Sequence, residues 1–144
     1  MPDPDDDSFC FVCGGGNPCG LRLTIQRDGA KVFSEFIPSG QFQGYRDIVH
    51  GGIISAVLDE MMVHAAMAES LFAVTAELRV RFKKPVRVGR PVRAEGELTR
   101  RTSRIVGGAA RLIDGETGDL LAEADAKMII TIPPSLNRGL PAVP

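Results

Sequence analysis

The chain has 144 residues and a mass of 15.5 kDa, which is enough for one domain with a single hydrophobic core. Hydrophobic residues make up 44% of it and charged residues 24%, so the composition excludes a disordered chain and a fibrous repeat. The formal net charge of −1 argues against bulk attraction to nucleic acid or to an anionic membrane surface.

The charges are nonetheless segregated along the chain. Residues 1–8 contain four aspartates and no basic residue. Residues 79–104 contain eight arginines and two lysines against two glutamates, a local charge of +8. In a nearly neutral protein, such a basic segment indicates either a small polyanionic ligand or a solvated strand face.

The sequence also bears on the compartment. Its acidic N-terminus lacks the basic region of a secretory signal peptide, and no apolar run approaches the 18 residues of a membrane span. The three cysteines, Cys10, Cys13 and Cys19, are odd in number and lie close together, so a disulfide framework is not expected. We therefore expect a cytoplasmic protein that is not bound to a membrane.

The first half of the chain predicts an arm, two strands and a helix. Residues 1–19 are rich in glycine and proline and are expected to be irregular. Alternation of apolar and polar residues predicts strands at 21–25 and 32–36, joined by a hairpin turn at 28–29. From Gly51 onwards the residues are apolar on nearly every side, so a helix here must be wrapped by protein.

The second half of the chain has a period of two residues, which predicts strands. These strands cover residues 78–82, 92–98, 104–113 and 122–132. Two strands, one helix and four strands with short connections predict an α+β fold, in which an antiparallel meander covers the helix with its apolar face.

The expected domain organisation is simple. An irregular N-terminal arm at residues 1–19 precedes a single domain at residues 20–134, and a loose tail follows at residues 135–144.

The start of the predicted helix carries the clearest chemical signal. His50 precedes Gly51 and Gly52, so the backbone can approach a ligand closely and the first N–H groups can stabilise a developing oxyanion. Asp59 lies two turns further along, where a carboxylate among apolar residues is costly unless it has a partner or a chemical role. The alternative is a helix that turns Asp59 and Glu60 towards solvent.

Several short motifs occur in a fixed order from Cys10 to Ile132. They are Cys13-Gly14, Asn17-Pro18, Gly20-Leu21, His50-Gly51-Gly52 with Asp59 nine residues after His50, Thr75-Ala76-Glu77-Leu78, Phe82-Lys83-Lys84-Pro85 and Ala122-Glu123-Ala124. In this order and spacing the sequence resembles the hotdog-fold acyl-CoA thioesterase superfamily, most of all its phenylacetate-pathway, or PaaI-like, type. The resemblance implies an antiparallel sheet wrapped around one long central helix. It also implies a homodimer that often pairs into a homotetramer.

The resemblance further implies hydrolysis of an acyl-CoA thioester to a free carboxylic acid and CoA. Asp59 corresponds to the catalytic carboxylate, which acts as general base or nucleophile, and the N–H of Gly51 corresponds to the oxyanion donor. Thr75 corresponds to a hydroxyl contributed across the dimer interface. His50 and Gly52 are expected beside the substrate, with His50 shaping the loop before the helix rather than acting as a base.

The basic segment acquires a candidate ligand from the same resemblance. Arg81, Arg100 and Arg104 correspond to contacts with the nucleotide side of CoA, and Lys83 is an added candidate. The pyrophosphate and 3′-phosphate of CoA suit arginine and lysine side chains. The alternative is that these residues form a water-facing strand surface. Because water is the acyl acceptor, no metal or redox cofactor is expected.

Two other motifs suggest different chemistry. Cys10, Cys13 and Cys19 could suggest zinc, but a compact zinc ribbon needs a second cysteine pair, which the sequence lacks. We therefore expect an arm that packs over the sheet or the active site. Asp59 and His64 resemble the Asp/His pair of hotdog hydratases, but five residues of helix separate their directions by about 140°.

Two functional alternatives remain open at this point. The chain could be a non-catalytic acyl-CoA or lipid-binding protein that keeps the fold, although Asp59, Gly51 and Thr75 together favour an enzyme. Alternatively, the cysteine arm could be a metal-dependent interaction module.

Overall fold

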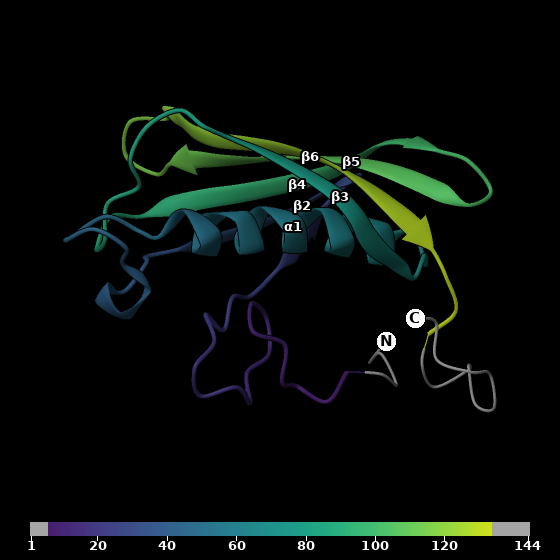
Figure 1. Cartoon of the computed structure of the whole chain (residues 1–144), viewed down its shortest axis with the longest axis horizontal. Coiled ribbons are helices and arrows are strands. Elements are labelled where there is room, and N and C mark those ends of the chain that lie inside the picture. The colour runs from purple at the N-terminus through teal and green to yellow at the C-terminus, as the bar shows by residue number, and fades with distance from the viewer. Residues whose placement is uncertain (1–5, 134–144) are drawn as a thin grey trace.

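The structure, a computed structural model, describes residues 6–133, so the expected tail at residues 135–144 lies outside the described part. One helix, α1 (Gly51–Ala68), lies along one face of a six-stranded antiparallel sheet (Figure 1). The short 3₁₀ helix η1 (Gly40–Phe42) precedes it. The strands are β1 (Gln26–Asp28), β2 (Lys31–Phe36), β3 (Ala73–Phe82), β4 (Val92–Arg101), β5 (Ile105–Asp114) and β6 (Leu120–Ile130). The predicted α+β hotdog fold is thereby confirmed.

The order of strands differs from a simple meander. It is β1-β2-β4-β5-β6-β3, so β4, β5 and β6 follow one another as predicted, but β3 lies beside β6 at the edge of the sheet. Nine of the ten residues of β3 pair with β6, and the other side of this strand has no neighbour within residues 6–133. The free edge of a strand of this length exposes a row of backbone donors and acceptors.

The strand predicted at residues 21–25 is wrong. The first strand begins at Gln26, and the preceding segment instead hydrogen-bonds to the arm, where Leu21 N donates to Phe11 O and Leu23 N donates to Val12 O, both at 2.9 Å. The alternation reflects burial against the arm and the core, since Leu23 is buried. The irregular N-terminal segment therefore extends about six residues beyond the predicted arm boundary.

The helix packs tightly on the inner face of the sheet. Its buried residues are Ile54, Val57, Leu58, Met61, Met62, Ala65 and Ala66. Gly96 of β4 permits the close approach, because a Cβ at this position would lie 2.6 Å from the carbonyl oxygen of Met61. The N-terminal arm passes on the other side of α1, so that the helix is enclosed between the sheet and the arm (Figure 1). The expectation that protein wraps this helix is confirmed.

The length and composition of α1 alone would allow it to cross a membrane. It has 18 residues and a mean hydropathy of 1.2, so the expectation that no stretch approaches a membrane span was too strong. Its apolar side chains pack into the hydrophobic core, which is typical of the central helix of a globular domain.

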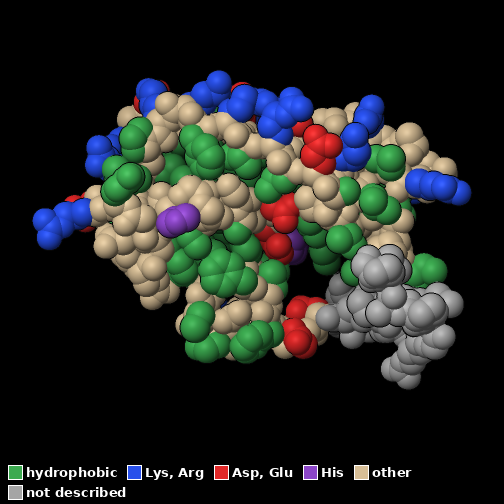
Figure 2. Space-filling view, in the orientation of Figure 1, with side chains coloured by type: hydrophobic (Ala, Val, Ile, Leu, Met, Phe, Trp, Pro, Cys, Tyr) green, Lys and Arg blue, Asp and Glu red, His purple; other side chains and the backbone are tan. Residues whose placement is uncertain are grey.

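The outer face of the sheet is charged. Lysine and arginine side chains gather along the side of the molecule that the sheet forms (Figure 2). Many of them contact acids on the same or a neighbouring strand: Arg93 lies 2.8 Å from Glu35 of β2 and 2.9 Å from Glu95 of its own strand, and Arg111 lies 2.7 Å from Glu95. One apolar face and one charged face are what the strand alternation predicted.

The close packing at Gly96 can be tested by substitution. We expect Gly96→Ala to lower the free energy of unfolding by about 1–3 kcal/mol, because the added methyl group meets main-chain atoms of α1 that cannot move independently. Urea denaturation measures this change. Gly15→Ala is the matched control, since a Cβ there meets nothing within 4 Å. Equal stability of the two variants would contradict the proposed packing constraint.

Candidate active site

The start of α1 is held in place by His50. The Nδ1 atom of His50 accepts a hydrogen bond from Gly52 N at 2.8 Å, which caps the helix. The backbone N–H of His50 donates to Phe42 O at 2.9 Å, and Val49 N donates to Val86 O at 2.8 Å. The loop before the helix is therefore fixed through its backbone and through the side chain of His50. Because Nδ1 accepts a hydrogen bond, a neutral His50 ring carries its proton on Nε2.

One backbone donor at this helix end remains available. The carbonyl of His50 accepts from Ile53 N and Ile54 N, and the ring of His50 accepts from Gly52 N. Within residues 6–133, the N–H of Gly51 has no acceptor. It adjoins a surface hollow that is lined by Gly44, Tyr45, Ile48, Val49, His50 and Gly51. Gly51 is therefore suited to stabilise an oxyanion through its backbone, whereas the Gly52 N–H is already used for the cap.

Asp59 and Thr75 form a second group of functional atoms. The hydroxyl of Thr75, near the start of β3, donates to Asp59 Oδ1 at 2.6 Å. Both residues are half-buried. Within the chain, β3 runs beside α1 and brings Thr75 and Asp59 together, so this contact needs no second copy, and the contribution of Thr75 across a dimer interface stays a prediction. This bond leaves Asp59 Oδ2 as the acceptor for a reacting water molecule.

Gly51 and Asp59 are too far apart to act on one carbonyl group in one chain. They are eight residues apart in a single helix, which corresponds to about 12 Å along the helix axis. An oxyanion donor and a catalytic base must each lie about 3 Å from the reacting groups. A single chain therefore holds two incomplete halves of the predicted site.

The surface between these two halves is apolar and exposed. Leu78 and Phe82 pair with the buried residues Ala126 and Ala122, which places them on the helix-facing side of β3, together with Thr75. Nevertheless they are 37% and 54% exposed. The ring of Phe82 reaches Gly51, since a Cβ built on that glycine would lie 3.4 Å from Phe82 Cζ. The edge strand β3 thus presents an apolar surface beside both halves of the site.

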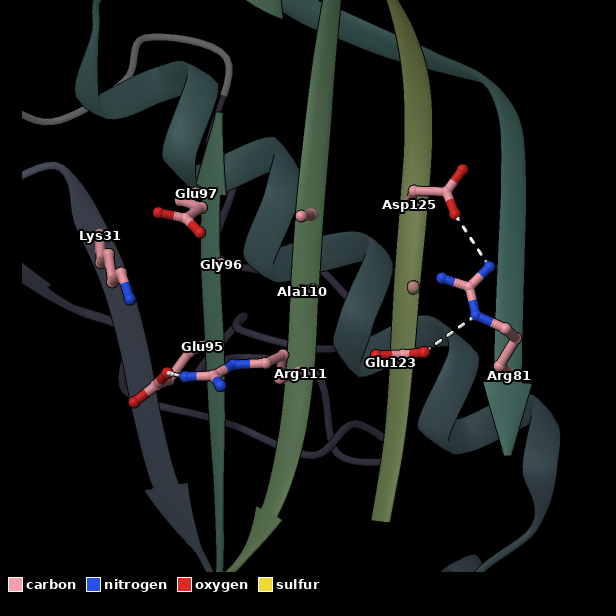
Figure 3. A pocket seen from close by; sticks show the side chains of 11 residues that line it. Lys31, Arg81, Glu95, Gly96, Glu97, Ala110, Arg111, Glu123 and Asp125 are labelled. Carbon is pink, nitrogen blue, oxygen red and sulfur yellow. Dashed lines mark hydrogen bonds and ion pairs between the residues drawn. The ribbon is translucent and has the colours of Figure 1, made fainter. Parts of the chain in front are cut away.

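The predicted CoA-binding residues lie on the other face of the sheet. Arg81 points towards β6, where it contacts Glu123 at 3.0 Å and Asp125 at 3.2 Å (Figure 3). Hydrogen bonds from Arg81 lower the pKa of Glu123, so this ion pair is already satisfied within the chain. Lys83 lies 3.7 Å from the same Glu123. In the single chain, Arg81 and Lys83 therefore lie on a water-facing strand surface, which is the alternative to CoA binding.

Arg100 and Arg104 differ from Arg81 and Lys83. Arg100 lines a hollow on the outer face of the sheet together with Glu77, Arg79 and Lys127. Arg104 lies in the turn between β4 and β5. Neither forms an ion pair with another residue of the described part of the chain. The structure therefore does not bring the four predicted basic residues together with Asp59 in one chain.

Sequence reasoning missed a cluster around Glu60. This carboxylate accepts hydrogen bonds from His64 Nε2 at 3.0 Å and from Cys13 Sγ at 3.1 Å. Burial raises the pKa of Glu60, but the bonds from His64 and Cys13 outweigh this effect and hold it below its usual value. The alternative that Asp59 and Glu60 both face solvent is therefore wrong. The spacing of Glu60 and His64, four residues apart on a helix, was the signal available in the sequence.

Comparison with known proteins agrees with this fold. The family model of the thioesterase superfamily matches residues 47–120, which include α1 and the strands β3, β4 and β5. The chain therefore belongs to the thioesterase superfamily, as its resemblance indicated. A comparison with curated proteins finds no match.

Three solved structures illustrate the likeness. A thioesterase superfamily protein is 20% identical with a TM-score of 0.77, and the match covers 81% of this chain and 60% of that one, less than two thirds of its length. The PaaI protein of the E. coli phenylacetic acid degradation operon is 16% identical with a TM-score of 0.71, covering 76% of this chain and 83% of that one. A Streptococcus mutans UA159 protein bound to acetyl CoA is 15% identical with a TM-score of 0.71, covering 76% and 88%. At these identities the likeness shows the shared fold.

The cap at His50 gives a testable prediction about the helix start. We expect His50→Ala to destabilise the protein by about 1 kcal/mol, because Gly52 N then loses its acceptor. His50→Asn should restore most of this loss, since asparagine is a good N-cap residue. Thermal and urea unfolding of both variants provide the measurement. If the two variants are equally destabilised, the ring of His50 stabilises the loop by some means other than capping.

Proposed function

We propose that the protein is an acyl-CoA thioesterase with Asp59 as its catalytic carboxylate. The observation that carries this proposal is the 2.6 Å hydrogen bond from Thr75 to a half-buried Asp59, beside an exposed apolar strand edge. A fixed carboxylate with one free oxygen suits a base that takes a proton from water, or a nucleophile. Membership of the thioesterase superfamily and the acetyl CoA found on the Streptococcus mutans protein support the substrate class.

We infer that the complete site needs two copies of the chain. One copy would supply Asp59 and Thr75, and its partner would supply the N–H of Gly51, because about 12 Å of helix separates these groups within one chain. The unpaired edge of β3 and the exposed Leu78 and Phe82 offer the surface for such a homodimer. Further pairing of dimers into a tetramer stays a prediction from the resemblance.

Hydrolysis would proceed through a tetrahedral intermediate. Asp59 Oδ2 takes a proton from water while the water oxygen bonds to the thioester carbon, and the carbonyl electrons move to its oxygen. The N–H of Gly51 and the positive end of the helix dipole stabilise this oxyanion. When the oxyanion reforms its double bond, the carbon–sulfur bond breaks and the CoA sulfur receives the proton from Asp59. His50, whose Nε2 carries a proton, lies beside this step and could donate to the carbonyl oxygen.

The same proposal assigns the phosphate groups of CoA to Arg100 and Arg104. These two side chains have no acidic partner within the described residues, whereas Arg81 and Lys83 would first have to give up Glu123. Guanidinium groups bind phosphate oxygens through two parallel hydrogen bonds.

The central prediction concerns Asp59. Asp59→Asn should reduce turnover of acyl-CoA by about 10²–10⁴-fold, because the amide cannot accept the proton of water. The assay follows release of the CoA thiol over a panel of aryl and aliphatic acyl-CoA substrates, which also identifies the acyl group. Circular dichroism and size-exclusion chromatography control for folding and assembly. Full activity of Asp59→Asn would refute the proposal, and binding without turnover by the unsubstituted protein would favour an acyl-CoA-binding protein.

The division of the site between two chains has its own test. Gly51→Pro removes the N–H donor but suits the first position of a helix, and His50 already has the extended backbone that precedes proline. Homodimers of Asp59→Asn and of Gly51→Pro should both be inactive. A heterodimer purified through two different affinity tags holds one intact site of two, so it should regain about half of the normal activity. Without such recovery, the site lies within one chain.

The assignment of CoA phosphates can be checked by kinetics. We expect Arg100→Ala and Arg104→Ala each to raise KM for acyl-CoA about two- to fivefold with little change in kcat. Added salt should raise KM of the unsubstituted protein and reduce the difference between the variants. Arg111→Ala, which removes an arginine already paired with Glu95, is the control. A KM that is insensitive to salt and to both substitutions would mean that the basic strands only face water.

A further inference from the structure

The arm and the central helix bring together a set of metal-binding atoms away from Asp59. Cys10 Sγ and Cys13 Sγ lie 3.5 Å and 3.1 Å from Glu60 Oε1, and the three ligand atoms are all within 4.8 Å of one another. The cluster joins two segments about 50 residues apart in sequence. The proposed mechanism uses none of these residues, so their arrangement needs a separate explanation.

The distances fit a tetrahedral zinc ion. Zinc binds thiolate sulfur at about 2.3 Å and carboxylate oxygen at about 2.0 Å, so sulfur and oxygen ligands at a tetrahedral angle lie about 3.5 Å apart. The two observed separations, 3.5 Å and 3.1 Å, are close to this value. Zinc would therefore require only small side-chain adjustments.

The backbone of the arm also supports metal binding. The N–H of Cys13 donates to Cys10 Sγ at 3.5 Å and holds this sulfur beside the second cysteine. Tight turns hold the two cysteines, since Gly14 N donates to Cys10 O at 2.8 Å. A side chain at Gly14 would lie 2.4 Å from Cys10 N, so this turn is closed to larger residues. The two-residue spacing of Cys10 and Cys13 is that of paired zinc ligands.

The electrostatic surroundings favour a cation. Glu60 is anionic and its side chain is only 16% exposed, yet His64 is the sole basic group that contacts it within residues 6–133. A divalent cation at this position would stabilise all three ligands in their anionic forms.

We propose that Cys10, Cys13 and Glu60 form a zinc-binding site that fixes the N-terminal arm to α1. Binding would release the two thiol protons to solvent, and each sulfur and one Glu60 oxygen would form a bond to the ion, with water in the fourth position. His64 would act as a positioning residue, because it lies one turn further along α1 and its Nε2 donates a hydrogen bond to the Glu60 carboxylate. The sequence lacks the second cysteine pair of a compact zinc ribbon, whereas in the folded chain α1 supplies a carboxylate ligand instead.

The site predicts a specific metal content. Protein purified under reducing conditions and dialysed against zinc sulfate should contain about one zinc per chain by elemental analysis. Cys10→Ser, Cys13→Ser and Glu60→Gln should each lose most of it. Cys19→Ser is the matched control and should keep the metal, because Cys19 is exposed and lies outside the cluster.

Two further measurements separate ligand loss from misfolding. Replacement of zinc by Co²⁺ in the unsubstituted protein should give thiolate-to-cobalt charge-transfer absorption and the visible bands of a tetrahedral ion. In the metal-loaded protein one of the three cysteines, Cys19, should react with a thiol reagent, and all three should react after chelation. His64→Ala should weaken zinc binding about 10–100-fold, with partial rescue by His64→Gln, which keeps an N–H donor.

Several results would overturn the proposal. The first is that the unsubstituted protein binds neither zinc nor cobalt. The second is that Cys13→Ser and Cys19→Ser bind equal amounts of zinc. The third is that the cobalt-loaded, reduced protein shows no thiolate-to-cobalt absorption. If the mass of the intact chain is lower by two hydrogen atoms, and stays lower under reducing conditions, Cys10 and Cys13 form a disulfide instead. None of these measurements depends on thioesterase activity.

Discussion

The structure depends on one constraint, which is that a helix apolar on nearly every side has to be covered on every side. The sheet covers one side of α1, and glycines such as Gly96 allow the close contact. The arm covers a second side with Val12 and Leu23. Beside β3 the cover is incomplete, since Leu78 and Phe82 stay exposed, and a second copy of the chain would complete it. The site that we propose for the thioester lies along this open side.

The same helix separates two adjacent carboxylates. Asp59 and Glu60 differ in direction by about 100°, so one meets the Thr75 hydroxyl of β3 and the other meets the cysteines of the arm. Each carboxylate thereby has partners that avoid the cost of an isolated buried charge. The Thr75 hydroxyl leaves Asp59 suited to proton transfer, and the cysteines of the arm make Glu60 suited to cation binding. Two neighbouring residues of the same type can therefore have different chemistry because they pack against different elements.

Sequence periodicity predicted the faces of the elements but not all their neighbours. It gave the helix from Gly51 and the two faces of β4–β6, because both depend on local alternation of apolar and polar residues. Periodicity could not place β3 beside β6. It also predicted a strand at residues 21–25, where apolar and polar residues alternate because the segment packs against the arm. The helix position of Asp59 was accessible from the sequence, whereas the sequence predicted only that His50 shapes the loop and the structure shows the cap. The pairing of Asp59 with Thr75 in one chain, and the cluster at Glu60, depend on contacts between distant segments.

The basic segment shows how such contacts change the meaning of a charge count. The net charge of +8 over residues 79–104 is counted along the chain, whereas a ligand meets the charge of a surface. On the outer face of the sheet, acids of β2 and β6 lie between these arginines, and Arg81 and Arg93 are each held by two carboxylates. Within residues 6–133, the arginines of this segment that form no ion pair are Arg79, Arg87, Arg100, Arg101 and Arg104, and our proposal assigns the CoA phosphates to two of them, Arg100 and Arg104. Recognition of CoA phosphates would therefore rest on a few positioned side chains, and the field of the whole basic segment would contribute less.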